Sequence, residues 1–429
     1  MKMINSKQNA LIRWSVSLIC VLIFVAGLIA CSSPSSSGSS GTPGPDAVAL
    51  LVLPLSKSLK PGEDFTLSWT VVPEDAPIIS WVSADTDVAV VDGNGKVTAK
   101  GLGKTNITAT AKGGITSSCT VTITPDFKNA TTSPAGKIAS IAFGGGIFVA
   151  GGSENGKIFY SSDKGITWNV AADSKLNSDE TVKSIAYGVY GGTGTFVAVG
   201  GRLYSPKIVT STDGGITWTL RTIPPSSIGT CISSVAYGNN TFVIGAEDSK
   251  MAMSTDGGQN WTAITGPFTT RIYSIAFGNE KFVAGGGDGG KIAYSDNTGT
   301  TWTPGTISPV PSDVSESIDS IAHGNGKFLA LEYLAKKLVS SENGTTWNQI
   351  AMVSDSSNPF PADSVKALCF GNGLFFVMSE RRIGFSQDGQ NIILLVVADL
   401  LDPMNCIAIG NDTVVVGLES GKVKYAALK

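Results

Sequence analysis

His323 is the one histidine among the 429 residues of the chain. Ser-His-Asp catalysis and multi-histidine metal sites both depend on this residue type, so the chain has little material for either. The patterns Gly-x-Ser-x-Gly, His-Glu-x-x-His and Cys-x-x-Cys are also absent from the sequence. We therefore predict no catalytic residue, no metal site and no cofactor, and the sequence leans against an enzyme.

Aspartates recur in a repeated sequence pattern that indicates structural turns and not catalysis. The pattern Ser-x-Asp-x-Gly-x-Thr-Trp is complete twice, loses only its Thr once, and occurs twice more with Asn297 or Glu342 at the Asp position. In such a turn Asp accepts backbone N–H bonds, Gly adopts a conformation that other residues resist, and Trp covers the hairpin. We predict a local structural role for the aspartates and tryptophans concerned: Asp163, Asp213, Asp256, Trp168, Trp218, Trp261, Trp302 and Trp347.

A second repeated phrase indicates the elements that carry these turns. The phrase Ile-x-Ser-Ile-Ala-aromatic-Gly, with variations, ends at Gly144, Gly188, Gly238, Gly278, Gly324, Gly371 and Gly410. Each copy is followed by a second apolar strand, then a third, then in most copies the Asp turn and a strand opened by Trp. Four strands in about 45 residues, repeated seven times, predict a seven-bladed β-propeller over residues 126–429. His323 occupies the aromatic slot of its copy, so we expect a core residue there.

The parity of positions along the phrase predicts which side chains share a face. Its Ser and Ala fall on one face of the strand, and its Ile and aromatic residue fall on the other. The last repeat ends at Lys429 without a fourth strand. We expect residues 126–133 to supply it, because an unpaired edge would otherwise remain.

The Asp turns resemble the Asp-box, or BNR, repeat of sialidases and related propellers. Sialidases carry three arginines at one site, a Tyr nucleophile with a Glu partner, and an Arg-Ile-Pro stretch. This propeller has no Arg-Ile-Pro and only five arginines: Arg202, Arg221, Arg271, Arg381 and Arg382. The chain is also similar to photosystem II assembly factor propellers, which act by binding protein. The resemblance thus implies the fold, and a divergent glycoside hydrolase is the alternative to a binding protein.

The N-terminus has the pattern of an export signal. Residues 1–13 are polar and basic, and residues 14–30 are almost wholly apolar. The ending Leu28-Ile29-Ala30-Cys31 resembles a bacterial lipobox, which implies a signal peptide over 1–30 and a lipid on Cys31; a single transmembrane anchor is the alternative. Residues 31–46 are a flexible Ser/Gly/Pro tether. We expect a lipid-anchored protein of the cell envelope, at the outer membrane and periplasmic or surface-exposed.

A small all-β domain is predicted over residues 47–124. Short alternating runs are separated by turn residues every 8–12 positions, which is typical of a β-sandwich. The stretch Ser80–Ala99, with Trp81 and Gly95-Lys96-Val97, resembles the bacterial Ig-like group 2 family. That resemblance implies a spacer, and an adhesin acting through this domain is the alternative.

One face of the propeller is the better candidate for binding. The Asp turns lie on the face of the first-to-second strand turns, so the other face carries the second-to-third turns and the connections between blades. Blades 5 and 6 break the glycine-rich pattern there and have long loops nearby at 303–317 and 348–364. Loops on a rigid scaffold often carry binding residues, so we predict ligand contacts at Glu332, Tyr333, Arg381 and Arg382.

Together these patterns predict a membrane-tethered envelope lipoprotein. Its non-catalytic propeller would serve for protein or glycan binding or for assembly, with the partner unidentified. The net charge of −3 makes nucleic acid an unsuitable partner.

Overall fold

The computed structural model describes residues 44–429, apart from 154–155, 225–227, 288–290, 309–316, 333–336, 351–364, 390–392 and 397–401, and gives residues 393–396 as backbone. The elements of these residues are β-strands, and no helix among them could cross a membrane. Residues up to Thr122, apart from 101–103, form one compact unit, and Ile123–Lys429 belongs to a second. The all-β class predicted from the sequence is confirmed.

The first unit is an Ig-like sandwich of short sheets. Its largest sheet has the order β2-β9-β8-β5, beside a sheet of order β3-β7-β6 and the pair β1-β4. Val97, Ile107 and Val121 are fully buried in its core. The strands are β1 (Ala49–Leu53), β2 (Ser56–Leu59), β3 (Asp64–Thr66), β4 (Ser68–Val72), β5 (Ile78–Ser83), β6 (Ala89–Val91), β7 (Lys96–Ala99), β8 (Gly103–Ala111) and β9 (Thr116–Ile123).

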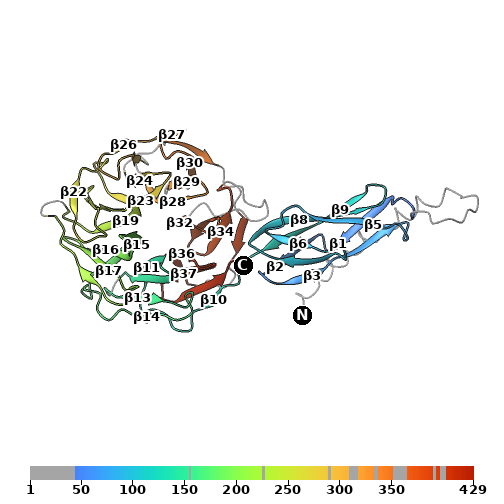
Figure 1. Ribbon diagram of the computed structural model, residues 1–429, viewed down its shortest axis with the longest axis horizontal. Helices are drawn as coiled ribbons and strands as arrows, with labels where there is room; N and C mark the ends of the chain where they lie inside the picture. Colours follow the sequence, from blue (N-terminus) through green and yellow to red (C-terminus); the bar gives the residue numbers. More distant parts are fainter. Residues whose placement is uncertain are drawn as a thin grey trace, which may run out of the picture. The chain divides into compact units, whose positions relative to one another are not determined.

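The second unit is a ring of seven antiparallel sheets, the predicted blades (Figure 1). The innermost strands coincide with the repeated phrase: β11 (Ile138–Gly144), β15 (Thr181–Tyr190), β19 (Ile232–Gly238), β23 (Ile272–Gly278), β28 (Ile318–Gly324), β32 (Val365–Gly371) and β36 (Met404–Gly410). The second strands are β12 (Ile147–Gly152), β16 (Thr193–Arg202), β20 (Thr241–Ala246), β24 (Lys281–Gly286), β29 (Lys327–Glu332), β33 (Leu374–Ser379) and β37 (Thr413–Leu418).

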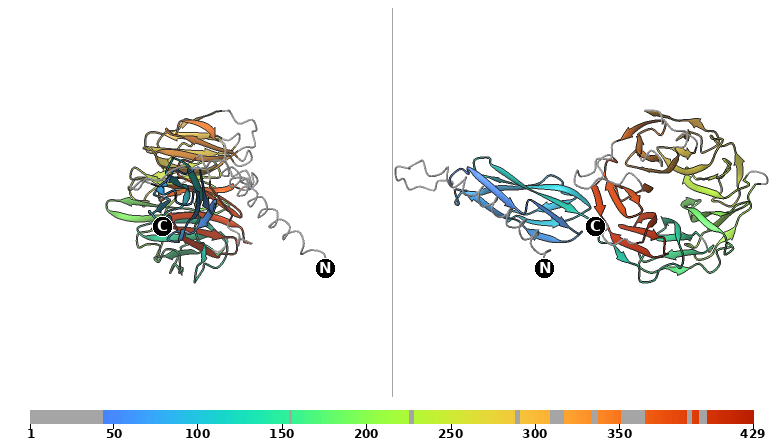
Figure 2. Two further views of the ribbon diagram at one scale, coloured as in Figure 1. Left: turned by 90° about the vertical axis from the view of Figure 1, so that its right-hand side faces the viewer. Right: turned by 180° about the vertical axis from the view of Figure 1, so that it is seen from behind.

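The outer strands complete each blade. The third strands are β13 (Ile158–Ser161), β17 (Ser205–Ser211), β21 (Met251–Ser254), β25 (Ile292–Ser295), β30 (Lys337–Ser341), β34 (Arg382–Ser386) and β38 (Val423–Ala427). The fourth are β14 (Asn169–Val170), β18 (Thr219–Leu220), β22 (Thr262–Ile264), β26 (Thr303–Pro304), β31 (Thr346–Ile350), β35 (Ile393–Val396) and β10 (Lys128–Asn129). Figure 2 shows the same ring from behind.

Two details of blade connections bear on the sequence predictions. The last blade has the order β10-β38-β37-β36, with Lys128 paired to Tyr425, so the predicted closure by residues 126–133 is confirmed. The prediction of a loop over 303–317 is wrong in its first half, because that half contains β26 and an extra strand, β27 (Thr306–Ser308). β27 runs parallel to β31, and its pairing gives the fifth blade a fifth strand.

The antiparallel order gives the ring two distinct faces. The innermost strands all begin on one face, which we call the start face; it also carries the second-to-third strand turns. The opposite face, the box face, carries the first-to-second strand turns and the Asp turns. Each strand reverses direction relative to its neighbour, so this assignment follows from the pairing itself.

The glycine that ends each phrase is required by the neighbouring blade. A Cβ atom on Gly144 would lie 2.0 Å from the ring of Tyr187, and one on Gly410 would lie 2.1 Å from the ring of Phe143. The same relation holds around the ring for Gly188 with Tyr237, Gly238 with Phe277, Gly278 with His323, Gly324 with Phe370 and Gly371 with Ile409. The aromatic slot of one blade therefore fills the space above the glycine of the preceding blade.

The serine of the phrase points to the following blade, whereas the aromatic residue points to the preceding one, as the parity predicts. Its hydroxyl also forms a hydrogen bond with that blade. Ser234 Oγ accepts a hydrogen bond from the backbone N–H of Ile275, in the next blade, at 2.9 Å. Equivalent bonds join Val235 to Ser184, Ile321 to Ser274 and Leu368 to Ser320. These serines join innermost strands that share no backbone ladder.

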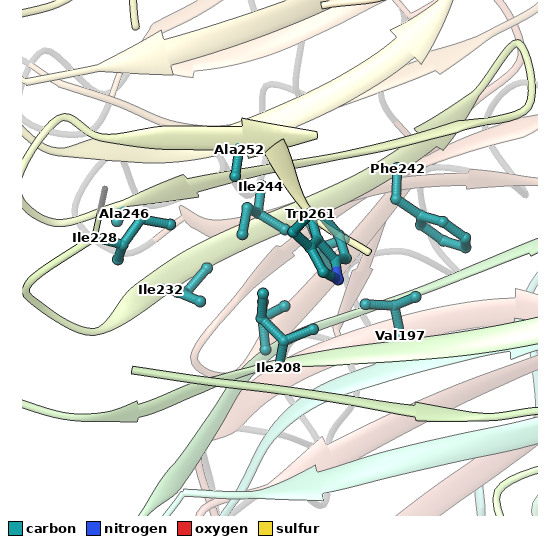
Figure 3. Packing of buried hydrophobic residues seen from close by; sticks show 11 residues of the cluster. Val197, Ile208, Ile228, Ile232, Phe242, Ile244, Ala246, Ala252 and Trp261 are labelled. Atoms are coloured by element: carbon teal, nitrogen blue, oxygen red, sulfur yellow. The ribbon is translucent and has the colours of Figure 1, made fainter. Parts of the chain in front are cut away.

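The Asp turns also contribute to the contacts between blades. Trp261 of blade 3 is 7% exposed and packs in one cluster with Val197 and Ile208 of blade 2 and Ile244 of its own blade (Figure 3). The turn glycines also leave no room for a side chain beside the neighbouring blade, because a Cβ on Gly215 would lie 2.9 Å from Val149 of the preceding blade. The expectation of a purely local turn is therefore too narrow.

Candidate functional site

The carboxylates of the Asp turns are occupied by hydrogen bonds inside each turn. Asp163 Oδ1 accepts the N–H of Thr167 at 2.9 Å and the hydroxyl of Ser161 at 2.8 Å. Its Oδ2 accepts the Thr167 hydroxyl at 2.5 Å. Burial would raise the pKa of Asp163, but the bonds from Thr167 and Ser161 outweigh it and lower the pKa. The same arrangement lowers the pKa of Asp213 and Asp256.

The tryptophans of these turns are also bound within the turn. Trp168, Trp218, Trp261 and Trp347 each donate Nε1–H to the carbonyl of the turn glycine, at 3.0–3.1 Å. Trp302 differs, because its Nε1 is buried without a partner in the described part of the chain. A carboxylate and an indole that are both tied to the turn backbone are poorly placed for chemistry on a ligand.

The fifth turn corrects the sequence reading. Glu342 was expected at the Asp position, but the acceptor is Asn343, whose Oδ1 accepts the N–H of Thr346 at 3.0 Å. The serine of the turn is Ser341, which lies opposite Phe328 as Ser161 lies opposite Phe148. This turn lacks the residue between the Asp position and the glycine, which shifts the apparent pattern by one position.

His323 is held between two blades on the box face. Its Nε2 lies 3.0 Å from Oδ1 of Asn279, and its ring centroid is 4.5 Å from that of Phe328. The Asn279 amide donates onward to the carbonyls of Gly326 and Glu342, at 2.9 and 2.7 Å. Burial lowers the pKa of His323, which favours the neutral ring. These contacts describe a packed histidine that bridges neighbouring blades.

The four predicted ligand residues differ in their exposure to solvent, and one of them lies outside the described residues. Glu332 ends β29 and is 3% exposed, so it is buried rather than displayed. Arg381 is exposed on the turn between β33 and β34, and Arg382 is half-buried with its N–H bonded to Ser379 Oγ at 3.0 Å. Tyr333 lies outside the described residues, as do Cys31 and the signal segment.

Sequence reasoning missed a second set of start-face residues. In every blade the pairing of the innermost strand with the second strand skips one residue. A β-bulge therefore lies at the second residue of the phrase. Such bulges redirect a side chain and are frequent beside functional sites. The residues skipped are Ala139, Lys183, Ser233, Tyr273, Asp319, Lys366 and Asn405. The signal was available in the repeats, because this position varies from blade to blade while its neighbours stay nearly constant.

Charged groups connect three blades at this level. Arg271, just before β23, forms an ion pair with Glu247 of blade 3, at 3.2 Å, and its guanidinium lies 5.5 Å from the ring centroid of Tyr273. Ser317 donates a hydrogen bond to Asp319 of blade 5. Burial raises the pKa of Asp319, and the Ser317 bond and the charge of Arg271 only partly oppose this.

Other groups on the start face keep unused binding capacity. Lys183 and Arg381 are exposed and form no ion pair within the described residues. The amide nitrogen of Asn405 is buried and has no hydrogen-bond partner in that part of the chain. No group of His, Cys, Asp and Glu side chains among the described residues could hold a metal ion. The described part of the start face therefore offers hydrogen-bond donors and cations.

Family comparisons agree with this architecture. Residues 51–122 match the bacterial Ig-like domain (group 2), residues 224–374 match the DUF6242 beta propeller domain, and residues 209–220 match the BNR/Asp-box repeat. The Ig-like domain and the BNR-type propeller predicted from the sequence are confirmed.

Sequence relatives match only short stretches. The chain is 42% identical over 86 residues to an uncharacterized protein of Clostridium acetobutylicum and 44% identical over 70 residues to a lacto-N-biosidase of Bifidobacterium bifidum. These matches span 18% and 16% of this chain but 9% and 6% of the two relatives, so they describe parts and not whole proteins.

Solved structures with a similar fold differ widely in sequence. YCF48 bound to a D1 peptide has a TM-score of 0.54 at 17% identity, covering 71% of this chain and 97% of that one. A streptogramin B lyase has a TM-score of 0.58 at 15% identity, covering 71% and 98%. At this identity the likeness shows the propeller fold alone.

Proposed function

We propose that this protein is a non-enzymatic binding protein of the bacterial envelope, which takes up a protein or glycan partner on the start face of its propeller. One observation carries the proposal. Seven nearly identical strands place six residue types at the same bulge, where only lysine occurs twice, on the face where unpaired Lys183 and Arg381 also lie. Variation confined to one position of a uniform scaffold is typical of a binding surface.

The box face supports the choice by contrast. The carboxylates of its Asp turns, its histidine and most of its tryptophans are bound within turns or between blades. The fold neighbours include a peptide-bound protein and a lyase, so the fold by itself favours neither binding nor catalysis. Binding is favoured over catalysis because the polar groups of the Asp turns are already used in structural hydrogen bonds.

Membrane attachment is part of the proposal and rests on the sequence. The ending Leu28-Ile29-Ala30-Cys31 and the Ser/Gly/Pro tether up to residue 46 support lipidation at Cys31 and display at the outer membrane. Mass spectrometry of the protein purified from its own cells should find an acylated Cys31 at the N-terminus. An unmodified Cys31, or a retained Met1, would overturn this part.

The binding face can be tested before the partner is identified. The tagged protein is crosslinked in its own cells, and its captured partners are quantified for the wild type and for Lys183→Glu and Arg381→Glu on the start face. Lys164→Glu, the same kind of charge change at an exposed position on the box face, is the matched control. We expect the start-face variants to lose a partner that the control keeps. Equal capture by all three variants would contradict the assignment, and turnover of fluorogenic glycosides by the wild type would favour a hydrolase.

A further inference from the structure

Every blade carries a cation at the beginning of its third strand. In each repeat a Lys or Arg directly precedes the first buried apolar residue of that strand, and these seven apolar residues are between 0% and 3% exposed. The cations are Lys157, Lys207, Lys250, Lys291, Lys337, Arg382 and Lys422. Lys and Arg together make up 31 of the 429 residues, so composition does not account for a cation in all seven repeats.

The strand pairing places these cations at one level of the propeller. Lys207 pairs with Gly200, which pairs in turn with Val182, the first residue of the phrase. Lys337 is connected to its phrase in the same way, and Arg382 lies beside Ser379, which pairs with the first residue of its own phrase. The carbonyls of the other four accept backbone N–H groups of the second strand at this level, at 2.9–3.0 Å. Since second-to-third strand turns lie on the start face, the seven form a cation ring there.

The side chains of the cation ring point away from the core. Side chains alternate along a strand, and the residue after each cation is buried. Lys157, Lys250, Lys291 and Lys422 are exposed, and the other three are half-buried. Lys207 forms an ion pair with Glu180 at 3.4 Å, whereas Lys250, Lys291 and Lys422 form none within the described residues. These three lysines can therefore bind an anion of a partner.

The box face shows no such pattern. The residues directly before the seven second strands lie on that face and include two acids and no cation: Gly146, Gly192, Asn240, Glu280, Gly326, Gly373 and Asp412. On the start face, three carboxylates are already paired with cations outside the ring: Glu247 with Arg271, Glu380 with Lys366 and Glu419 with Lys137. The repeated cation is therefore a property of the start face, and these carboxylates do not neutralise it.

One hairpin projects beyond the level of the cation ring. In blade 2 the strand pairing continues for two residues past Lys207, and the turn that follows is Leu203-Tyr204. At about 3.4 Å per residue, this tip lies about 7 Å further out than the cation. Leu203 is 62% exposed and Tyr204 is 80% exposed. A flat surface such as a lipid bilayer would meet this tip before it met the cations, whereas a flexible chain can pass beside it.

We propose that the cation ring binds an acidic polysaccharide, one that carries carboxylates at intervals along its sugar units. Six of the seven cations are lysines, which are flexible point charges and do not need the planar, bidentate geometry that suits arginine. One cation on each blade matches an extended polymer with separated charges, because such a chain can contact several blades. Duplex nucleic acid, with one charge per about 1.7 Å, favours a denser basic surface.

The inference rests on the proposed function, because it names the chemical class of the partner on the start face. Isothermal titration of the purified protein with polygalacturonate, alginate and hyaluronate tests it. Fully methyl-esterified polygalacturonate, which has lost its charge, is the ligand control. We expect at least one acidic polymer to bind at about 50 mM NaCl, with an affinity that falls steeply towards about 200 mM, and the esterified polymer not to bind.

A triple variant removes the exposed charges of the ring that have no ion pair. Lys250→Gln, Lys291→Gln and Lys422→Gln together should weaken binding about tenfold or more and lessen its dependence on salt. The matched control removes the same charge from exposed positions outside the ring: Lys104→Gln, Lys128→Gln and Lys164→Gln. It should bind as the wild type does. Both triple variants should keep the wild-type melting temperature, because they change exposed side chains only.

Several results would overturn the inference. These are failure of all three acidic polymers to bind, equal binding of the esterified polymer, and equal weakening by the two triple variants. Tighter binding to polyglutamate or to vesicles of phosphatidylglycerol would assign the ring to an acidic protein or to a membrane instead. The proposed function is tested separately by crosslinking. A captured partner that is lost with Lys183→Glu, without any polysaccharide binding, would keep the start face as the binding surface and remove this inference alone.

Discussion

At the scale of single residues, the contacts between blades explain why the phrase repeats so faithfully. Gly278 has no space for a side chain, because a Cβ atom would lie 2.0 Å from His323, which is itself packed on Phe328. The glycines and aromatic slots could be read from the sequence as a pattern. Their pairing across blades could not, because the partners are far apart in the chain, as Gly278 and His323 are at 45 residues, and belong to separate sheets.

We expect Gly278→Ala to destabilise the propeller by about 3 kcal/mol, the upper range for overpacking a core. Thermal and denaturant unfolding measure this change. Gly229→Ala is the control, because its Cβ would meet only Asp248 at an ordinary 3.5 Å. Equal stability of the two variants would show that the neighbouring blade can move aside.

Asp319 makes an unfavourable contribution that fits a functional residue. Burial raises its pKa in the folded protein, so the folded state holds its proton to higher pH than the unfolded chain does. Stability from this residue is therefore greatest below the unfolded pKa of about 3.9 and falls as the pH rises towards the folded pKa. Asp319→Asn should be more stable than the wild type at pH 7, with the difference shrinking towards pH 3. A difference that does not change with pH in urea unfolding curves would contradict the burial argument.

At the scale of the elements, the sequence predicted the strands better than their irregularities. Alternation and turn residues located four strands per repeat, because those signals are local. The bulge at Asp319 and its equivalents could not be derived from parity, which assumes a regular ladder. The shortened fifth turn misled the reading for the same reason, since Glu342 and Asn343 differ only in register.

The serine bonds between innermost strands give a direct test of how blades adhere. Ser234→Ala leaves the N–H of Ile275 buried without its acceptor, so it should cost about 1–3 kcal/mol of unfolding free energy. Ser162→Ala, at an exposed position of an Asp turn, should change stability by less than about 0.5 kcal/mol. If the two alanine variants unfold alike, the serine is only a small residue at a crowded position.

At the scale of the whole molecule, closure of the ring depends on the two ends of the propeller segment. β10 pairs with β38, Lys137 forms an ion pair with Glu419 at 2.8 Å, and Phe143 covers Gly410. The sequence predicted the strand closure, because the last repeat lacks a fourth strand. The ion pair joins residues 282 positions apart and had no sequence signal.

Deletion of residues 126–133 should expose the edge of β38 and weaken the ring. We expect a lower melting temperature and self-association in size-exclusion chromatography. A deletion within the Ser/Gly/Pro tether, of eight residues in 32–46, is the control for chain length. A truncated propeller that stays monomeric with an unchanged melting temperature would show that the blade is complete without β10.

The central claim, that the propeller binds through its start face and keeps its Asp turns for structure, is tested most directly by affinity measurements on folded protein. Once a partner has been captured, its dissociation constant is measured with Arg381→Ala, Tyr333→Ala and Asp213→Ala. The start-face variants should each weaken binding by about 1–3 kcal/mol if they are interface anchors. Asp213→Ala should lower the melting temperature and leave the affinity of the folded fraction unchanged, because the Asp213 carboxylate bonds within its own turn. Loss of binding in Asp213→Ala, with Arg381→Ala and Tyr333→Ala unaffected, would contradict the account.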